Sequence, residues 1–313
     1  MKILIAYDGS DSADTAIDSL QRAGLPAEHV DALVVSVGEV WLPPADTAGD
    51  TFPSHEPPGL KEARERAASV IAEAEQLAQR GCERVQQIFP SWRVDHDVRN
   101  GTPGFELLNC AREWQADLIV VGSHGHTALG RFVLGSVSQK LLTEASTSVH
   151  VARPSTGTEK SAERIVIGVD GSSGALAAIR AVKKRHWTEG SELRIVVADD
   201  VMRGSPIWLL IPPIREFVQE VETEERTQAE QFALAAAKEL RESLGERNVT
   251  VSSMVISGDP KKVLIEHAEE FGADCIFTGA TGFSSRLERV ILGSVSAAIA
   301  ARAHCSVEVV REG

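Results

Sequence analysis

Residues Asp117 to Ser138 read DLIVVGSHGHTALGRFVLGSVS, and the organisation of the whole chain can be worked out from them. The segment from Leu118 to Val121 is short, apolar and rich in Ile and Val, which is typical of a buried strand in a parallel sheet. The segment from Val137 onward predicts a helix. Glycines therefore lie between the carboxyl end of a strand and the start of a helix, where open α/β sheets bind their ligands.

These glycines follow the spacing Gly-x2-Gly-x9-Gly-Ser, with Gly122, Gly125 and Gly135 as its fixed points. Glycine lets the backbone pass close to a ligand, and a helix N-terminus offers unpaired N–H groups to a phosphate. The hydroxyl groups of Ser136 and Ser138 add to this helix start. The spacing differs from the P-loop and from the dinucleotide fingerprint, because no Lys follows Gly135 and no G-x-G-x-x-G is present. The alternative interpretation is an ordinary tight connection.

A second copy of the same pattern lies in the other half of the chain. The apolar segment from Asp274 to Thr278 leads into Gly279 and Gly282, and Leu292 to Ser296 repeats the sequence LGSVS. Ten residues rather than nine separate Gly282 from Gly293. Because the strand, the loop and the helix start all recur together, the repeat favours a ligand-binding loop over an ordinary connection.

Composition and charge exclude several classes of protein. A length of 313 residues predicts about two domains. The net charge of −13 opposes non-specific binding to nucleic acid or to an anionic membrane. The four cysteines form no C-x-x-C, so reduced thiols are expected rather than a zinc site or a disulfide framework. The start of the chain is not typical of a signal peptide and no apolar run reaches membrane-spanning length, so a cytoplasmic protein is expected.

Strand and helix patterns alternate in the same order in both halves. This alternation predicts an α/β fold with doubly wound parallel sheets and right-handed crossovers. The helix from Leu60 is expected to end near Gly81, and the segment from Ile214 to Leu244 is expected to be one long helix or a broken pair. Pro-rich irregular loops are expected at 38–59 and 199–213. Strands are expected at 2–7, 32–37, 93–98, 117–121 and 148–152, and again at 164–169, 191–198, 249–256, 274–278 and 305–310.

The carboxyl ends of parallel strands meet at one edge of a sheet, so Asp8, Val37 and the glycine loop should line one crevice. With phosphate at the loop, the nucleoside end of a ligand would point toward Asp8 and the second strand. A carboxylate suits ribose hydroxyls, an exocyclic amine or a bound Mg²⁺. Asp170 and Ala198 are the matching residues of the second half. The alternative for Asp8 is that it only supports a helix start in an Asp-Gly turn.

These features together resemble the universal stress protein family in its tandem two-domain form. The resemblance covers nearly the whole chain and rests on Asp8–Ser10 and Asp170–Ser172, both Asp-Gly-Ser, and on the two glycine loops. It implies two tandem Rossmann-like domains, each a five-stranded parallel sheet with helices on both faces. The first domain is expected at 1–153, the linker at 154–163 and the second domain at 164–313.

The resemblance also implies that each half binds ATP, through the loop glycines and the Gly-Ser helix start. The expected first site comprises Asp8, Val37, Gly122, Gly125, Gly135, Ser136, Val137 and Ser138. The expected second site comprises Asp170, Ala198, Gly279, Gly282, Gly293, Ser294, Val295 and Ser296. The sequence leaves open whether Mg²⁺ accompanies the nucleotide. Because the second loop has one extra residue, the second site is expected to bind ATP more weakly, or to bulge and still deliver Gly293 to the phosphate.

Other charged or reactive residues are weaker candidates. His124, His126 and Arg131 could contact phosphate, but Thr281 and Phe283 replace the two histidines in the second half, so catalysis common to both halves cannot rest on them. The basic run from Lys183 to His186 is better explained by favourable placement at a helix C-terminus than by nucleic-acid binding.

The last strand of each half, Ser148 to Ala152 and Ser306 to Val310, would leave an exposed edge unless it is covered. Pairing of these two edges would arrange the halves as an internal pseudo-dimer, and the sequence leaves open a further homodimer. The function that the sequence favours is a nucleotide-dependent stress-response or signalling protein with no nucleic-acid or membrane partner. The alternatives are a slow ATPase or phosphotransferase, or a structural scaffold with empty nucleotide sites.

Overall fold

The computed structural model describes residues 1–40, 58–125, 134–154, 162–199, 212–245, 248–281 and 292–312, without the side chains of 58 and 212–222. The chain divides into two compact units. Met1–Asp18 and Pro26–Ala152 form the first unit, and Ser19–Leu25 and Arg153–Gly313 form the second. A short segment of the first sequence repeat therefore belongs to the second unit, which the sequence-based division at residue 153 did not include.

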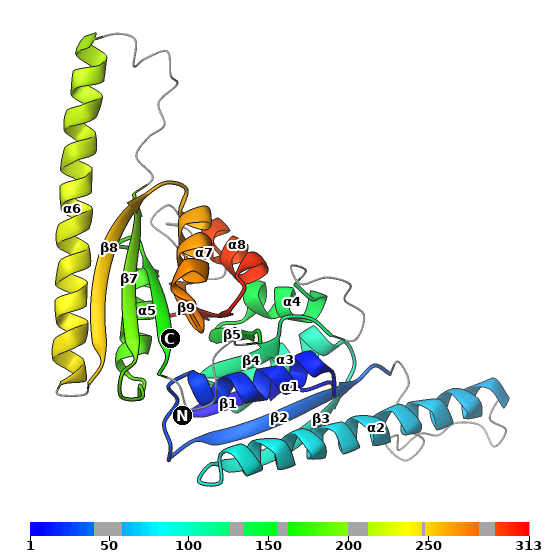
Figure 1. The fold of residues 1–313 in the computed structure, drawn as a ribbon. Helices are drawn as coiled ribbons and strands as arrows, with labels where there is room; N and C mark the ends of the chain where they lie inside the picture. Colours follow the sequence, from blue (N-terminus) through cyan, green and yellow to red (C-terminus); the bar gives the residue numbers. More distant parts are fainter. Residues whose placement is uncertain are drawn as a thin grey trace. The chain divides into compact units, whose positions relative to one another are not determined.

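The first unit contains a parallel sheet in the order β3-β2-β1-β4-β5, drawn from blue to green in Figure 1. The order reverses between β1 and β4, so a ligand crevice is expected outside the carboxyl ends of these two strands. The elements in chain order are β1 (Lys2–Ala6), α1 (Asp11–Ser19), η1 (Leu20–Arg22), β2 (Asp31–Gly38), α2 (Pro58–Ile88), β3 (Arg93–Asn100), α3 (Pro103–Trp114), β4 (Leu118–Gly122), α4 (Ser136–Glu144) and β5 (Ser148–Ala152).

The second unit repeats this topology in the order β10-β9-β6-β7-β8, again with parallel pairing throughout. The corresponding reversal lies between β6 and β9. Its elements are β6 (Arg164–Val169), α5 (Ser173–Lys183), β7 (Glu192–Asp199), α6 (Pro212–Leu244), β8 (Thr250–Ser257), α7 (Pro260–Phe271), β9 (Cys275–Gly279), α8 (Ser294–Arg302) and β10 (Ser306–Val310). The predicted fold class, two tandem parallel α/β units, is confirmed.

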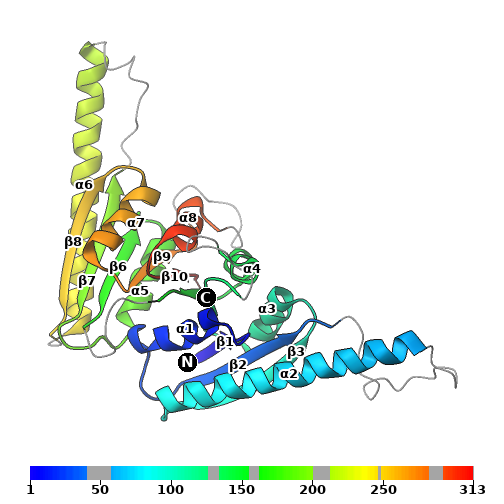
Figure 2. The same cartoon turned by 45° about the vertical axis from the view of Figure 1, so that its right-hand side comes forward.

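Helices cover both faces of the second sheet (Figure 2). On one face, Ile165 and Ile167 of β6 pack with buried residues of α5 and α6, including Ile179 and Leu240. On the other face α7 approaches closely, because a Cβ atom on Gly168 would lie 2.8 Å from Cδ1 of Leu264. This alternation along β6 follows from the two-residue repeat of a strand, in which successive side chains point to opposite faces.

One of the two long helices differs from the sequence-based expectation. The prediction that the helix of the first unit ends near Gly81 was wrong, because α2 continues to Ile88. A Cβ atom on Gly81 would lie 2.9 Å from Cγ of Tyr7 and from Cγ1 of Val34, so this glycine lets the helix approach the sheet. In the second unit the segment from Pro212 to Leu244 is one helix. The expected irregular loops lie largely outside the described residues, and the pseudo-dimer pairing stays a prediction.

Candidate functional site

A tight turn connects the end of β1 to α1. Oδ1 of Asp8 accepts hydrogen bonds from the backbone N of Ser10 at 3.0 Å and from its hydroxyl at 2.6 Å. Gly9 has a φ of +76°, a left-handed conformation that favours glycine. The Ser10 hydroxyl in turn accepts from the backbone N of Ala13 at 3.2 Å and so caps the helix. Asp8 therefore supports the turn that starts α1, and its Oδ1 atom makes the two hydrogen bonds of this turn.

The other carboxylate oxygen of Asp8 faces the glycine loop. Oδ2 lies 3.0 Å from the point where a Cβ atom on Gly125 would stand, and among the described residues no other atom outside the immediate neighbours comes within 4 Å of that point. The structure therefore brings together two residues that lie far apart in the sequence. This closeness is expected because strand order reverses between β1 and β4, so the segments that follow these two strands lie next to each other. The space beside Gly125 is a cradle that a side chain would fill.

Gly122 has a different reason to be glycine. A Cβ atom there would meet Ser12 of α1, lying 2.6 Å from its backbone oxygen. Ser12 also accepts a hydrogen bond through its hydroxyl from the backbone N of His124 at 3.3 Å. Gly122 thus allows the start of α1 to pack against the glycine loop. The sequence alone gave no reason to place Ser12 in the site.

The start of α4 closes the loop. The backbone N of Gly135 donates to the backbone O of Ser123 at 2.8 Å. The N-cap residue of the helix is Gly135, which has no side chain, and no side chain of the described residues caps the helix in its place. The first-turn N–H groups, including those of Ser136 and Val137, have no acceptor within the helix. The Ser138 hydroxyl donates to the backbone O of Gly122 at 2.7 Å and is buried, which makes Ser138 a positioning residue that ties helix to loop.

The second strand extends toward the same edge. β2 pairs Val35 with Ala6, the last residue of β1, and continues for three residues to Gly38. Val37 lies in this extension, half-buried and paired with Arg99 of β3.

Tyr7, the residue just before Asp8, is held in place by a hydrogen bond to α1. Burial and the neighbouring Asp14 carboxylate raise the pKa of Tyr7 to about 12, so its hydroxyl stays protonated and donates to Asp14 at 2.8 Å.

The second unit reproduces this arrangement. Oδ1 of Asp170 accepts from the backbone N of Ser172 at 3.0 Å, and the Ser296 hydroxyl donates to the backbone O of Gly279 at 2.6 Å. The backbone N of Gly293 donates to the backbone O of Ala280 at 2.7 Å, as Gly135 does to Ser123. The C-terminal end of the ten-residue loop is therefore anchored like that of the nine-residue loop. Gly282 lies outside the described residues.

One difference separates the two sites. Gly174 occupies the position of Ser12, four residues after the aspartate of the turn. A Cβ atom on Gly279 would lie 2.6 Å from the backbone O of Gly174, and one on Gly174 would collide with the backbone O of Thr281. Backbone therefore packs against backbone at the start of α5. Ala198, which matches Val37, is half-buried in β7 and pairs with Ile256.

Of the two histidines and the arginine that could contact phosphate, only His124 belongs to the described residues. Nδ1 of His124 lies 2.9 Å from the Ser123 hydroxyl, within the loop itself. His126, Arg131 and Phe283 lie outside the described residues. Within the part of the chain that the structure describes, no group of three or more His, Cys, Asp or Glu side chains is arranged to hold a metal ion. In that same part, no helix combines the length and apolarity that crossing a membrane requires.

Comparison with known proteins identifies the family. The model of the universal stress protein family matches residues 1–153 and again 162–311. This chain belongs to the universal stress protein family, and it carries two copies of the family's domain. A universal stress protein of Thermus aquaticus is 37% identical over 151 residues, which cover 48% of this chain and 97% of the relative. The Bacillus subtilis universal stress protein YxiE is 31% identical over 165 residues, covering 49% and 98%.

Solved structures support the fold over the whole length. A universal stress protein from Archaeoglobus fulgidus superposes with a TM-score of 0.61 at 19% identity, covering all of this chain and 98% of that one. A Pseudomonas aeruginosa protein of unknown function, PA1789, gives 0.56 at 12% identity, covering 99% and 92%. At these identities the likeness concerns the fold, so the chemistry of this member of the universal stress protein family depends on its own residues.

Proposed function

We propose that this universal stress protein binds ATP in its first unit and acts as a nucleotide-dependent stress-response or signalling protein. The observation that carries the proposal is the convergence of three features: Asp8, the space that the described residues leave beside Gly125, and the start of α4 with glycine as its N-cap residue. A carboxylate and an anion-binding helix start on one crevice suit a ligand that has both hydroxyl groups and phosphates.

Each part of the proposed site has a distinct task. The first-turn N–H groups of Ser136 and Val137 bind phosphate, and Gly135 leaves them accessible. Gly125 lets the backbone approach the ligand. Asp8 and the backbone of Val37 bind the nucleoside end, while Gly122 and Ser138 hold the loop in place. The chain is acidic overall, so the N–H groups at this helix start provide the local attraction for the negatively charged phosphates of ATP.

The second unit supports a second site of the same kind. Asp170, Gly279 and Ser296 repeat the hydrogen bonds of the first unit, and Gly293 is anchored as Gly135 is. We include Ala198, Ser294 and Val295 by the same correspondence, and Gly282 from the sequence alone. The close contact of the Gly174 backbone with Gly279 and the longer loop lead us to expect weaker ATP binding at the second site than at the first.

Native mass spectrometry of the full chain, purified without added nucleotide and then titrated with ATP, tests the proposal. The expected result is one tightly held nucleotide and a second bound at higher concentration. Calorimetry with and without Mg²⁺ gives the affinities. cAMP serves as a control, because it has an adenosine but no triphosphate for the α4 start. Absence of saturable ATP binding, or equal binding of cAMP and ATP, would contradict the assignment of the triphosphate to this loop.

A further inference from the structure

The second unit contains a cavity that the nucleotide sites do not use. Its volume is about 370 Å³, and it is lined by Arg164, Glu192, Arg194, His267, Glu270 and Phe271. Arg164 and Glu192 are the first residues of β6 and β7, so the cavity opens at the amino ends of the strands, opposite to the glycine loop. The C-terminal turns of α7 form its other wall. This volume lies within the range of small-molecule sites.

Arg194 is the unusual residue of this cavity. Among the residues that the structure describes, it forms no ion pair, and its buried Nε has no hydrogen-bond partner. One terminal nitrogen lies 3.3 Å from Nε2 of His267, and the guanidinium carbon lies 3.7 Å from the ring centre of Phe271. Burial and the Arg194 charge lower the pKa of His267, so this histidine is a neutral acceptor and supplies no counter-charge. Because arginine stays protonated, Arg194 carries a positive charge in this cavity with no carboxylate paired to it in the described residues.

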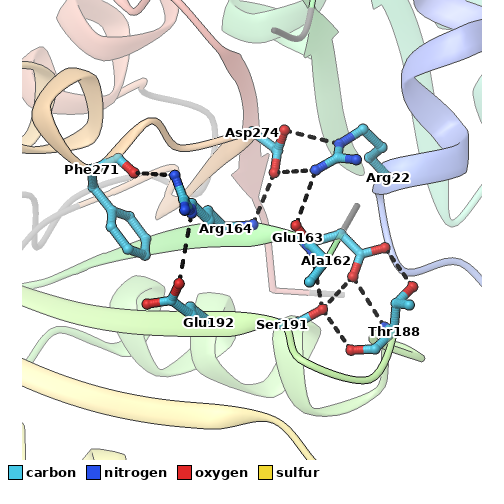
Figure 3. Close-up of polar contacts among 9 residues, drawn as sticks. All are labelled: Arg22, Ala162, Glu163, Arg164, Thr188, Ser191, Glu192, Phe271 and Asp274. Atoms are coloured by element: carbon cyan, nitrogen blue, oxygen red, sulfur yellow. Dashed lines mark hydrogen bonds and ion pairs between the residues drawn. The ribbon is translucent and has the colours of Figure 1, made fainter. Parts of the chain in front are cut away.

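Neither acidic residue of the cavity forms an ion pair with Arg194 in the part of the chain that the structure describes. Glu192 lies 3.6 Å from Nε of Arg164, and Arg164 also donates to the backbone O of Phe271 at 3.4 Å (Figure 3). This second bond caps the C-terminus of α7. The charge of Glu270 acts on His267 from the same helix. Of the two arginines, only Arg194 therefore lacks a carboxylate in the described residues.

The first repeat shows that the fold does not require this arginine. Arg164 pairs in register with Glu192 in the second sheet, and Lys2 pairs with Asp31 at the same place in the first. Two residues further along the strand, the first sheet has the buried Leu33 where the second has Arg194. The matching helix carries Cys110 in place of His267, counted from Pro103 and Pro260. The charged cavity is thus a property of the second unit alone.

We propose that this cavity binds a small anion with a carboxylate or phosphate group, held by the guanidinium group of Arg194. A guanidinium fork matches two oxygens of either group, and stacking on Phe271 fixes its plane in advance. Arg164 provides a second positive charge at the rim. The anion supplies the negative charge that the guanidinium group of Arg194 lacks among the described residues. This site is independent of the proposed ATP sites, which lie at the other end of the strands.

Nuclear magnetic resonance of the full chain, following the Nε–Hε signal of Arg194, tests the proposal. Inorganic phosphate and succinate are titrated separately, with sodium chloride at matched ionic strength as the control. The expected result is a saturable shift with at least one of the two anions and none with chloride. A shift with phosphate indicates that the site accepts a phosphate group, and a shift with succinate indicates that it accepts a carboxylate. No saturable shift with either anion would overturn the proposal.

Two variants separate binding from structure. Arg194→Leu copies the first repeat and is expected to fold; loss of a charge-assisted hydrogen-bonding group predicts binding at least about tenfold weaker. Glu192→Gln removes a competing negative charge and is expected to tighten binding. A purely structural Arg194 would predict no tightening. Unchanged affinity in a folded Arg194→Leu protein, or weaker binding in Glu192→Gln, would overturn the proposal. If Arg194→Leu does not fold, the Glu192→Gln titration alone decides.

Discussion

In the first unit, Oδ2 of Asp8 lies 3.0 Å from the point where a Cβ atom on Gly125 would stand. Within the part of the chain that the structure describes, no backbone atom lies that close, so among those residues an added methyl group meets a side-chain oxygen. The two residues come from different strand ends, and their closeness follows from the reversal of strand order between β1 and β4. A substitution at Gly125 therefore reports on the ligand space more than on the fold.

The first prediction concerns this space. Gly125→Ala is expected to weaken ATP binding at the first site by at least about tenfold, the scale of one lost charge-assisted hydrogen bond. The methyl group would occupy the cradle and stand beside the Asp8 carboxylate. Calorimetry gives the affinity, and thermal unfolding checks that the fold is retained.

Gly122→Ala is a misleading variant for the same purpose, because its Cβ would collide with Ser12 and disturb α1. Gly59→Ala is the suitable control, since no atom of the described residues lies within 4 Å of a Cβ there. If Gly125→Ala bound ATP as tightly as the parent protein, the loop would not hold the phosphates.

The second prediction concerns the two aspartates. Asp8→Ala is expected to weaken the first site and leave the second nearly unchanged, and Asp170→Ala the reverse, because each carboxylate belongs to its own unit. Native mass spectrometry counts the nucleotides that remain. Loss of both sites from one substitution would indicate a single shared site, and unchanged binding would show that the turn is the only task of these residues.

Much of this arrangement could be predicted from the sequence because it depends on local signals. The apolar strands, the Asp-Gly-Ser turns and the cap at Asp259, which accepts from the backbone N of Lys261 at 2.9 Å, are all local. The strand from Arg164 to Val169 has the bounds expected from its apolar pattern. The convergence of Asp8 with the glycine loop followed from topology rather than from spacing.

What the sequence could not show depends on contacts between distant residues. Gly81 was interpreted as a helix end because glycine weakens helices, yet the ring of Tyr7 requires it in the helix interior. The packing of Ser12 on Gly122 has no local signal either. The assignment of Ser19–Leu25 to the second unit arises from tertiary contacts alone.

The third prediction concerns the longer loop of the second unit. Deletion of Ser284 restores the nine-residue spacing and is expected to tighten ATP binding at the second site. Gly293 is already anchored to Ala280 as Gly135 is to Ser123, so the deletion leaves this described end of the loop in place. Calorimetry would compare parent and deletion, each with Gly125→Ala to disable the first site. Equal or tighter binding without the deletion would show that the extra residue is harmless.

The fourth prediction tests the close contact between α2 and the sheet. Gly81→Ala is expected to destabilise the first unit by about 1–3 kcal/mol, since overpacking against Tyr7 and Val34 outweighs the helix propensity of alanine. Gly59→Ala in the first turn of the same helix has open space and is expected to stabilise by up to about 1 kcal/mol. Urea unfolding measures both. Stabilisation by Gly81→Ala would mean that the helix can move away from the sheet at little cost.

The last prediction concerns a buried ion pair of the second unit. The guanidinium group of Arg22 donates through Nε to Oδ1 of Asp274 at 2.9 Å and through Nη2 to Oδ2 at 2.6 Å (Figure 3). Both side chains are buried, with exposed fractions of 9% and 7%. Arg22 also donates to the backbone O of Ala162, and Asp274 accepts from the backbone N of Arg164. The pair therefore fastens the segment Ser19–Leu25 to the start of β6.

Arg22→Ala leaves the Asp274 carboxylate buried without its cation and is expected to destabilise the second unit by about 3–5 kcal/mol. Arg84→Ala is the matched control, because Arg84 pairs with Asp18 at 2.8 Å while both side chains are partly exposed, and its loss is expected to cost at most about 1 kcal/mol. Urea unfolding of the two variants gives the comparison. If both substitutions cost the same, the buried pair would contribute no more than a surface one, and Ser19–Leu25 would be held by its backbone contacts, such as the bond from the N of His186 to the O of Gly24 at 2.7 Å.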